Sequence, residues 1–261
     1  MARAEASLGP CARDRLLGGR VALWQPQTGY RAATDPVLLA AACPATPGDT
    51  VLELGLGAGA ASLCLAARVP GLALAGLELQ PGYAELAAAN AAAAGVALEV
   101  IEGDVAAPPA TLRARRFDHV ILNPPWHAHG PAAASAARDA AHREQASGPP
   151  LATWIDAALA RCRPRGRLTM IHRAERLDTI LATLTGAAGE IRVLPLAPRE
   201  GRPAKRVIVT ARTQVRGPLR LMAPLVVHQG SHHTGDRDDF STALSAILRD
   251  AAPIDLAEKP G

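Results

Sequence analysis

Cysteine is scarce in this 261-residue chain, and the few that occur lie far apart in the sequence. They are Cys11, Cys43, Cys64 and Cys162. No pair has the short spacing of a zinc-binding motif, and the spacing does not suggest a set of disulfides. The sequence therefore predicts neither a disulfide framework nor a structural zinc site, and it indicates a reducing compartment.

Long apolar runs are also missing. No stretch approaches the ~18 uninterrupted apolar residues of a membrane-spanning helix. The alanine-rich segment 83–100, for example, carries Glu85, Asn90 and Glu99. The first residues include Arg3 and lack the apolar core of a secretory signal. We therefore expect a cytoplasmic protein without membrane association, and nothing in the sequence predicts a stable protein partner.

Aromatic residues make up only 3% of the chain, which argues against stacking on a long run of bases. Lysine is nearly absent, so the formal net charge of +4 comes almost entirely from arginine, whose planar fork suits phosphate and base recognition. Basic residues are densest between 199 and 220, which permits a nucleic-acid partner. The candidate RNA-binding residues in this segment are Arg199, Arg202, Lys205 and Arg206.

Short apolar runs alternate with alanine- and leucine-rich helical segments, a pattern typical of strands and crossover helices. The predicted strands are 49–54, 72–77, 98–102, 117–122, 167–172, 190–196 and 205–211. We expect an α/β fold with a doubly wound, seven-stranded Rossmann-like sheet, mostly parallel, with helices on both faces. Residues 49–213 would form this domain, with an N-terminal extension at 1–48 and a C-terminal extension at 214–261 packed on or near the core.

A glycine cluster ends the first predicted strand, where Glu53 precedes Gly55, Gly57 and Gly59. Glycines between a strand and a helix let backbone N–H groups approach a ligand closely. Gly55, Gly57 and Ala60 also fit the dinucleotide-binding spacing. The glycine spacing alone therefore leaves S-adenosylmethionine and a nicotinamide dinucleotide as alternatives.

Acidic residues follow the next two predicted strands. Glu78 closes the second strand, where a carboxylate can accept hydrogen bonds from ribose hydroxyls. Asp104 follows the third strand, where a side chain can reach an adenine edge. Either nucleotide cofactor needs such contacts, and the neighbouring Leu79 and Val105 are further candidate cofactor contacts.

The motif Asn123-Pro124-Pro125-Trp126 follows the fourth predicted strand, which lies beside the first in a doubly wound sheet, at the point where ligands bind. Two prolines fix the backbone and leave carbonyls as acceptors, while Asn123 adds a side-chain acceptor and Trp126 a flat face. An amine held by the Asn123 oxygen and the Pro124 carbonyl would direct its lone pair at an electrophile. The motif therefore predicts a clamp for a planar amine.

Together these motifs resemble the class I S-adenosylmethionine-dependent methyltransferases that methylate nitrogen, and most closely the bacterial tRNA1(Val) adenine-37 N6-methyltransferases. The resemblance covers roughly residues 16–211. It includes Gly18–Val21, Gln25-Pro26, Gly29–Arg31, Asp35–Leu39, Asn123–Trp126, Ile171–Arg173 and Gly201–Arg206. Tryptophan stands where tyrosine or phenylalanine is commoner, and it should still stack on a base.

The resemblance implies a role for each motif. Tyr30 to Asp35 would form a lid over S-adenosyl-L-methionine, the methionine moiety would lie against Glu53 and the three glycines, and the target base would lie against residues 123–126. Glu78 would bind the ribose and Asp104 the adenine.

The implied reaction is direct methyl transfer to the N6 of an adenine in tRNA, adenine 37 of the anticodon loop. Asn123 would favour the pyramidal nitrogen of the transition state. The loop 127–150 would face the RNA, with His127 and Arg143 as candidate contacts. The histidines of this loop and of the tail have no metal-ligand spacing, so we expect no bound metal.

The same residues are also compatible with other functions. Guanine-N2 methylation of ribosomal RNA and glutamine-N5 methylation of a protein would use the same clamp. A catalytically silent RNA-binding module and a nicotinamide-dependent oxidoreductase are alternatives of other kinds, although the intact clamp argues against the first and no hydride-transfer residues support the second.

Overall fold

The computed structural model describes residues 7–28, 31–126, 148–230 and 239–256. Over these residues the chain forms a nine-stranded sheet in the order β10-β8-β9-β7-β6-β3-β4-β5, with β11 also paired to β8. Its strands are β3 Thr50–Leu54, β4 Ala73–Glu78, β5 Leu98–Glu102, β6 Phe117–Leu122, β7 Cys162–Arg173, β8 Ala188–Ala197, β9 Arg206–Thr213, β10 Arg220–Leu221 and β11 Leu225–Val226. The seven predicted strands and the doubly wound fold class are confirmed; β7 begins earlier than predicted, and the short edge strands β10 and β11 were not predicted.

Among the strands of the sheet, β9 alone runs opposite to the rest. The pairs β3·β4, β4·β5, β3·β6 and β6·β7 are parallel, whereas β9 lies antiparallel between β7 and β8. The parallel strands therefore end at one shared edge, the carboxyl edge. Because β9 runs the opposite way, the loop between β8 and β9 returns to this edge as well.

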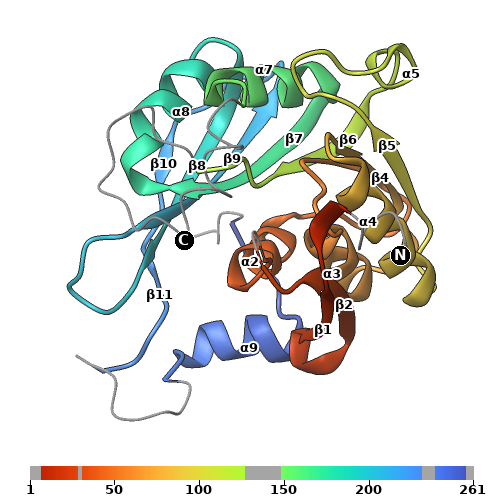
Figure 1. Ribbon diagram of the computed structural model, residues 1–261. Helices are drawn as coiled ribbons and strands as arrows, with labels where there is room; N and C mark the ends of the chain where they lie inside the picture. Colours follow the sequence, from red (N-terminus) through yellow and green to blue (C-terminus); the bar gives the residue numbers. More distant parts are fainter. Residues whose placement is uncertain (1–6, 29–30, 127–147, 231–238, 257–261) are drawn as a thin grey trace.

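Helices cover both faces of the sheet (Figure 1). They are α2 Thr34–Ala42, α3 Ala60–Arg68 and α4 Pro81–Ala93 on one face, and α5 Ala110–Arg113, α7 Leu151–Arg161 and α8 Leu177–Leu184 on the other. A hydrophobic core lies on each face of the sheet, and successive residues of a strand pack into opposite cores. Val51 and Ile121 pack on the α2 side, and Leu52 packs on the α7 side. Within the described ranges, no helix is long and apolar enough to cross a membrane.

A separate two-stranded hairpin, β1 Cys11–Leu16 and β2 Val21–Pro26, lies in the segment predicted only as an N-terminal extension. The buried side chain of Asn90 on α4 attaches it to the main domain. Its oxygen accepts a hydrogen bond from the Trp24 N–H at 2.8 Å, and its amide nitrogen donates to the carbonyls of Trp24 at 3.0 Å and Ala58 at 2.9 Å. One amide group thus joins the hairpin, α4 and the glycine-rich loop.

Substituting Asn90→Ala would leave three backbone groups without their partner in a buried place. We expect this variant to lose about 2–4 kcal/mol of unfolding free energy, measured by urea denaturation. Ala88→Ser, on the exposed side of the same helix, should stay within about 0.5 kcal/mol of the parent protein. Equal stability of the two variants would contradict the proposed role of Asn90.

Candidate active site

The carboxyl edge of the sheet collects the predicted site residues from four neighbouring strands. Central strand β3 has β6 on one side and β4 on the other, with Leu54 opposite both Leu122 and Leu77. The glycine-rich loop, the Glu78 loop and the Asn123 motif therefore leave the sheet at the same level, side by side, with the Asp104 loop beyond Glu78. Open parallel sheets bind ligands at this edge.

The glycine-rich loop turns sharply from β3 into α3. Gly55, Gly57 and Gly59 have φ values of 75°, 53° and 86°, in the left-handed region that glycine adopts without strain. A Cβ atom added at Gly57 would meet nothing within 4 Å, so the backbone there borders open space. At Gly55 such an atom would lie 3.0 Å from the Trp154 ring of α7. The loop thus forms a cradle that is open at Gly57.

Glu53 lies beneath this loop and is almost completely buried. Its carboxylate accepts hydrogen bonds from the Ser62 N–H at 2.9 Å and the Ser62 hydroxyl at 2.6 Å. Burial raises the pKa of Glu53 to about 8, although the bonds from Ser62 favour the charged form; the nearby Glu78 carboxylate adds to the rise. These contacts fix the first turns of α3 to β3.

Glu78 links the end of β4 to the glycine-rich loop. One carboxylate oxygen accepts the Gly57 N–H and the other the Gln80 N–H, both at 2.8 Å. Burial raises the pKa of Glu78, while the backbone N–H groups act in the opposite direction. The next side chain, Leu79, is 60% exposed and provides an apolar surface at this edge of the sheet.

Asp104 lies at the end of β5 beside the buried Val105. Its carboxylate accepts the Ala106 N–H at 2.8 Å, which fixes the turn that follows the strand. Lone pairs remain on this carboxylate for a further donor, because an ionised carboxylate accepts about four hydrogen bonds.

The Asn123 motif follows β6 directly. Pro124 is buried, Asn123 is half-buried, and Trp126 is 36% exposed. The Arg173 guanidinium lies over the Trp126 ring at 5.2 Å from its centroid, a cation–π contact. Arg173, the last residue of β7, thus covers one face of the Trp126 indole.

The predicted lid residue Asp35 lies at the start of α2, where its carboxylate forms an ion pair with Arg206 of β9. Arg206 also donates to the Thr34 hydroxyl at 3.3 Å. Gln25 holds the other end of this region, because its side chain bonds the Ala32 N–H at 2.6 Å and the Ala32 carbonyl at 3.1 Å. Tyr30 lies outside the described residues.

Comparison with known proteins identifies the family. Residues 33–149 match the model of the methyltransferase small domain. A tRNA1(Val) (adenine(37)-N6)-methyltransferase from Porphyromonas gingivalis is 32% identical over 185 residues, which are 65% of this chain and 72% of the relative. This chain belongs to that methyltransferase family.

Two further matches extend over most of the methyltransferase. A relative of the same name from Dickeya chrysanthemi is 29% identical over 226 residues, covering 84% of this chain and 87% of the relative. The crystal structure of a predicted O-methyltransferase from Agrobacterium tumefaciens superposes with a TM-score of 0.67 at 27% identity, over 84% of this chain and 98% of that one.

The four basic residues of the segment 199–206 that are predicted to bind RNA differ in exposure and in their ion pairs. Arg202 and Lys205 are exposed on the β8–β9 loop, at the carboxyl edge. Arg199 is buried, donates to Asp239 at 2.5 Å and bonds the Gln229 carbonyl, so it holds the tail against the sheet. Arg206 is engaged with Asp35.

The remaining RNA-contact predictions, His127 and Arg143, lie outside the described residues. Within the described part of the chain, no cluster of histidine, cysteine, aspartate and glutamate is suited to hold a metal ion.

Sequence reasoning missed three residues of this methyltransferase site. Trp154 closes one side of Gly55, Arg173 covers Trp126, and Asn90 bonds the carbonyl of Ala58 in the loop. The position of Arg173 at the carboxyl end of a strand was an available signal. Trp154 and Asn90 sit within helices, where residue type and spacing give no such indication.

The raised pKa of Glu53 predicts a pH-dependent stability. The unfolded carboxyl ionises near 4.5 and the folded one near 8, so ionisation opposes folding and the unfolding free energy should fall as the pH rises through this window. Glu53→Gln keeps an oxygen for both Ser62 donors and should show a smaller fall between pH 5 and pH 8 in urea titrations. An unchanged fall would contradict this assignment of the pKa.

Proposed function

We propose that this enzyme transfers a methyl group from S-adenosyl-L-methionine to the exocyclic N6 of an adenine in tRNA, the adenine at position 37 of the anticodon loop. The observation that carries the proposal is the Asn123-Pro124-Pro125-Trp126 clamp beside the open glycine cradle, in a chain whose family is named for this reaction. The family also favours a methyl donor over a nicotinamide cofactor.

The residues at the carboxyl edge fit S-adenosyl-L-methionine. The backbone around Gly57 is open to a ligand, the Glu78 carboxylate lies next to it, and exposed Leu79 offers an apolar surface to a flat ring. Glu78 would accept from the ribose hydroxyls and Asp104 from the adenine. The cofactor supplies an electrophilic methyl group.

Asn123 and Pro124 act on the target amine. The N6 amino group would donate its two N–H bonds to the Asn123 side-chain oxygen and the Pro124 carbonyl, which directs the nitrogen lone pair away from the ring system. Since this lone pair is delocalised in adenine, the clamp assists by favouring the pyramidal nitrogen of the transition state. Trp126 offers the base the indole face that Arg173 does not cover.

The β8–β9 loop supplies positive charge on the same side of the molecule. Arg202 and Lys205 are exposed there, and a tRNA whose adenine enters the clamp would pass its phosphates close to this edge. A base in an anticodon loop is already partly unstacked, which lowers the cost of moving it into the clamp.

The first test incubates the protein with tRNA and labelled S-adenosylmethionine and identifies the labelled nucleoside after digestion. We expect N6-methyladenosine. Asn123→Ala should lower the transfer rate by about 10²–10³-fold, since it removes one of the two acceptors, while cofactor affinity measured by calorimetry stays unchanged. Full activity of this variant, or label in guanosine or in protein, would contradict the proposal.

A second test addresses stacking on Trp126. Trp126→Ala should raise KM for tRNA by about tenfold, in line with the ~1–3 kcal/mol that a stacked base contributes. Trp126→Phe keeps a flat face and serves as the matched control, with a KM close to that of the parent enzyme. Similar KM values for the two variants would show that the indole does not hold the base.

A further inference from the structure

A basic pocket lies at the amino end of β6 and β7, at the edge of the sheet opposite the clamp. Its volume is about 380 Å³. Its charged lining residues are Arg163, Arg165, Arg167, Arg212 and Asp118, and His119 also borders it. Counting along β6, His119 precedes Asn123 by four residues, about 13 Å of strand, so the pocket is separate from the methyl-transfer site.

The loop 163–166 forms one wall of this pocket and is firmly held. It bulges out of β7, where the register with β6 shifts between Phe117 and His119. The Thr213 hydroxyl donates to the Arg163 carbonyl at 2.6 Å, and Arg212 Nε donates to the Arg165 carbonyl at 3.2 Å. The wall is thus fixed before any ligand arrives.

The backbone of this loop is closely packed at Gly166 and strained at Arg165. A Cβ on Gly166 would lie 2.9 Å from the Arg163 carbonyl oxygen, so only glycine fits. Arg165 has φ 63°, a left-handed conformation that costs a non-glycine residue about 1 kcal/mol or more. Arginine therefore occupies a position at which glycine would be unstrained.

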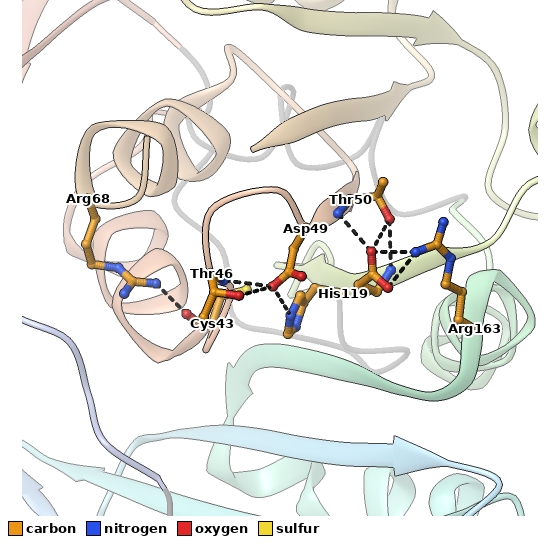
Figure 2. A network of polar contacts seen from close by, with 8 residues as sticks. Cys43, Thr46, Asp49, Thr50, Arg68, His119 and Arg163 are labelled. Atoms are coloured by element: carbon orange, nitrogen blue, oxygen red, sulfur yellow. Dashed lines mark hydrogen bonds and ion pairs between the residues drawn. The ribbon is translucent and has the colours of Figure 1, made fainter. Parts of the chain in front are cut away.

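Part of the pocket's charge is balanced within the protein. Arg163 donates to both carboxylate oxygens of Asp118, at 2.6 and 2.7 Å, and Asp118 also accepts from the Thr50 N–H and hydroxyl (Figure 2 labels Thr50 and Arg163). Burial acts to raise the pKa of Asp118, but the Thr50 bonds and then Arg163 outweigh it and lower the pKa to about 2. This pair is therefore ionised at neutral pH.

The remaining arginines exceed their counter-charges. Arg167 and Arg212 share Glu190, at 4.0 and 3.2 Å. The Arg165 guanidinium has neither an ion pair nor a hydrogen bond with any described residue. His119 contacts Asp49 at 3.3 Å, as Figure 2 shows, and burial lowers its pKa despite that contact, so the ring is neutral near pH 7.

We propose that this pocket binds a phosphate group. Guanidinium forks match phosphate oxygens in geometry and charge, and an anion would relieve the repulsion among Arg165, Arg167 and Arg212. The phosphate belongs either to the RNA backbone or to a free phosphorylated small molecule, since both carry the same group. Binding of the isolated anion does not depend on methyl transfer, so this inference can fail or succeed separately from the proposed function.

The direct test titrates inorganic phosphate into the protein at constant ionic strength and follows binding by calorimetry. Arg165→Ala should weaken phosphate binding by about tenfold, the effect of one charge-assisted contact. Arg165→Gly relaxes the backbone and should lose binding equally, whereas Arg165→Lys keeps part of it. Arg13→Ala removes an exposed arginine on β1 and should leave binding unchanged. No phosphate binding by the parent protein, or equal binding by all variants, would overturn the proposal.

The second measurement distinguishes the two sources of phosphate. If the RNA backbone occupies the pocket, Arg165→Ala will lower tRNA affinity and reduce the slope of log K against log salt by about 0.7–0.9, the value for one lost phosphate contact. If a free phosphorylated molecule occupies it, tRNA affinity will stay unchanged while phosphate binding is lost. Both results support the site and assign its ligand.

Discussion

The parallel pairing of β3 with β4 on one side and with β6 on the other is the constraint on which this molecule's chemistry depends. Leu54 is hydrogen-bonded in register with strands that end in Glu78 and in Leu122. The glycine-rich turn, Glu78 and the Asn123 motif, from distant parts of the sequence, therefore emerge together. Both faces of these strands are packed with aliphatic residues, so a slip in register would break two cores at once.

Placing the acids at this edge has an electrostatic consequence. Glu53 and Glu78 are both buried, and burial raises the pKa of each. Each is held by hydrogen bonds from the backbone of the turn it supports. With a pKa of about 8, Glu53 is largely protonated and uncharged at neutral pH, in contrast to the positive charge of the β8–β9 loop and of the basic pocket at the far edge.

The sequence predicted the sheet well because its strands are short continuous apolar runs between turn residues. The positions of the glycine-rich turn after β3 and of the Asn123 motif after β6 were also predictable, since each depends on local residue order. The hairpin β1–β2 was not, because β1 carries three consecutive charged residues, 13–15, in place of an apolar run, and the hairpin is attached by Asn90, far along the chain. Likewise, no local pattern could show that Arg206 faces Asp35 from 171 residues away, or that Arg199 is buried against the tail. Basic residues near one another in sequence therefore divided into two exposed side chains and two engaged ones.

The attachment of the hairpin by Asn90 also bears on the order in which the chain folds during synthesis. The hairpin is synthesised before α4, so the side chain that bonds the Trp24 backbone is made 66 residues later. A two-stranded ribbon alone is only marginally stable in water. The hairpin must thus remain loosely structured until α4 is complete, and the glycine-rich turn at Ala58 acquires its final support in the same step.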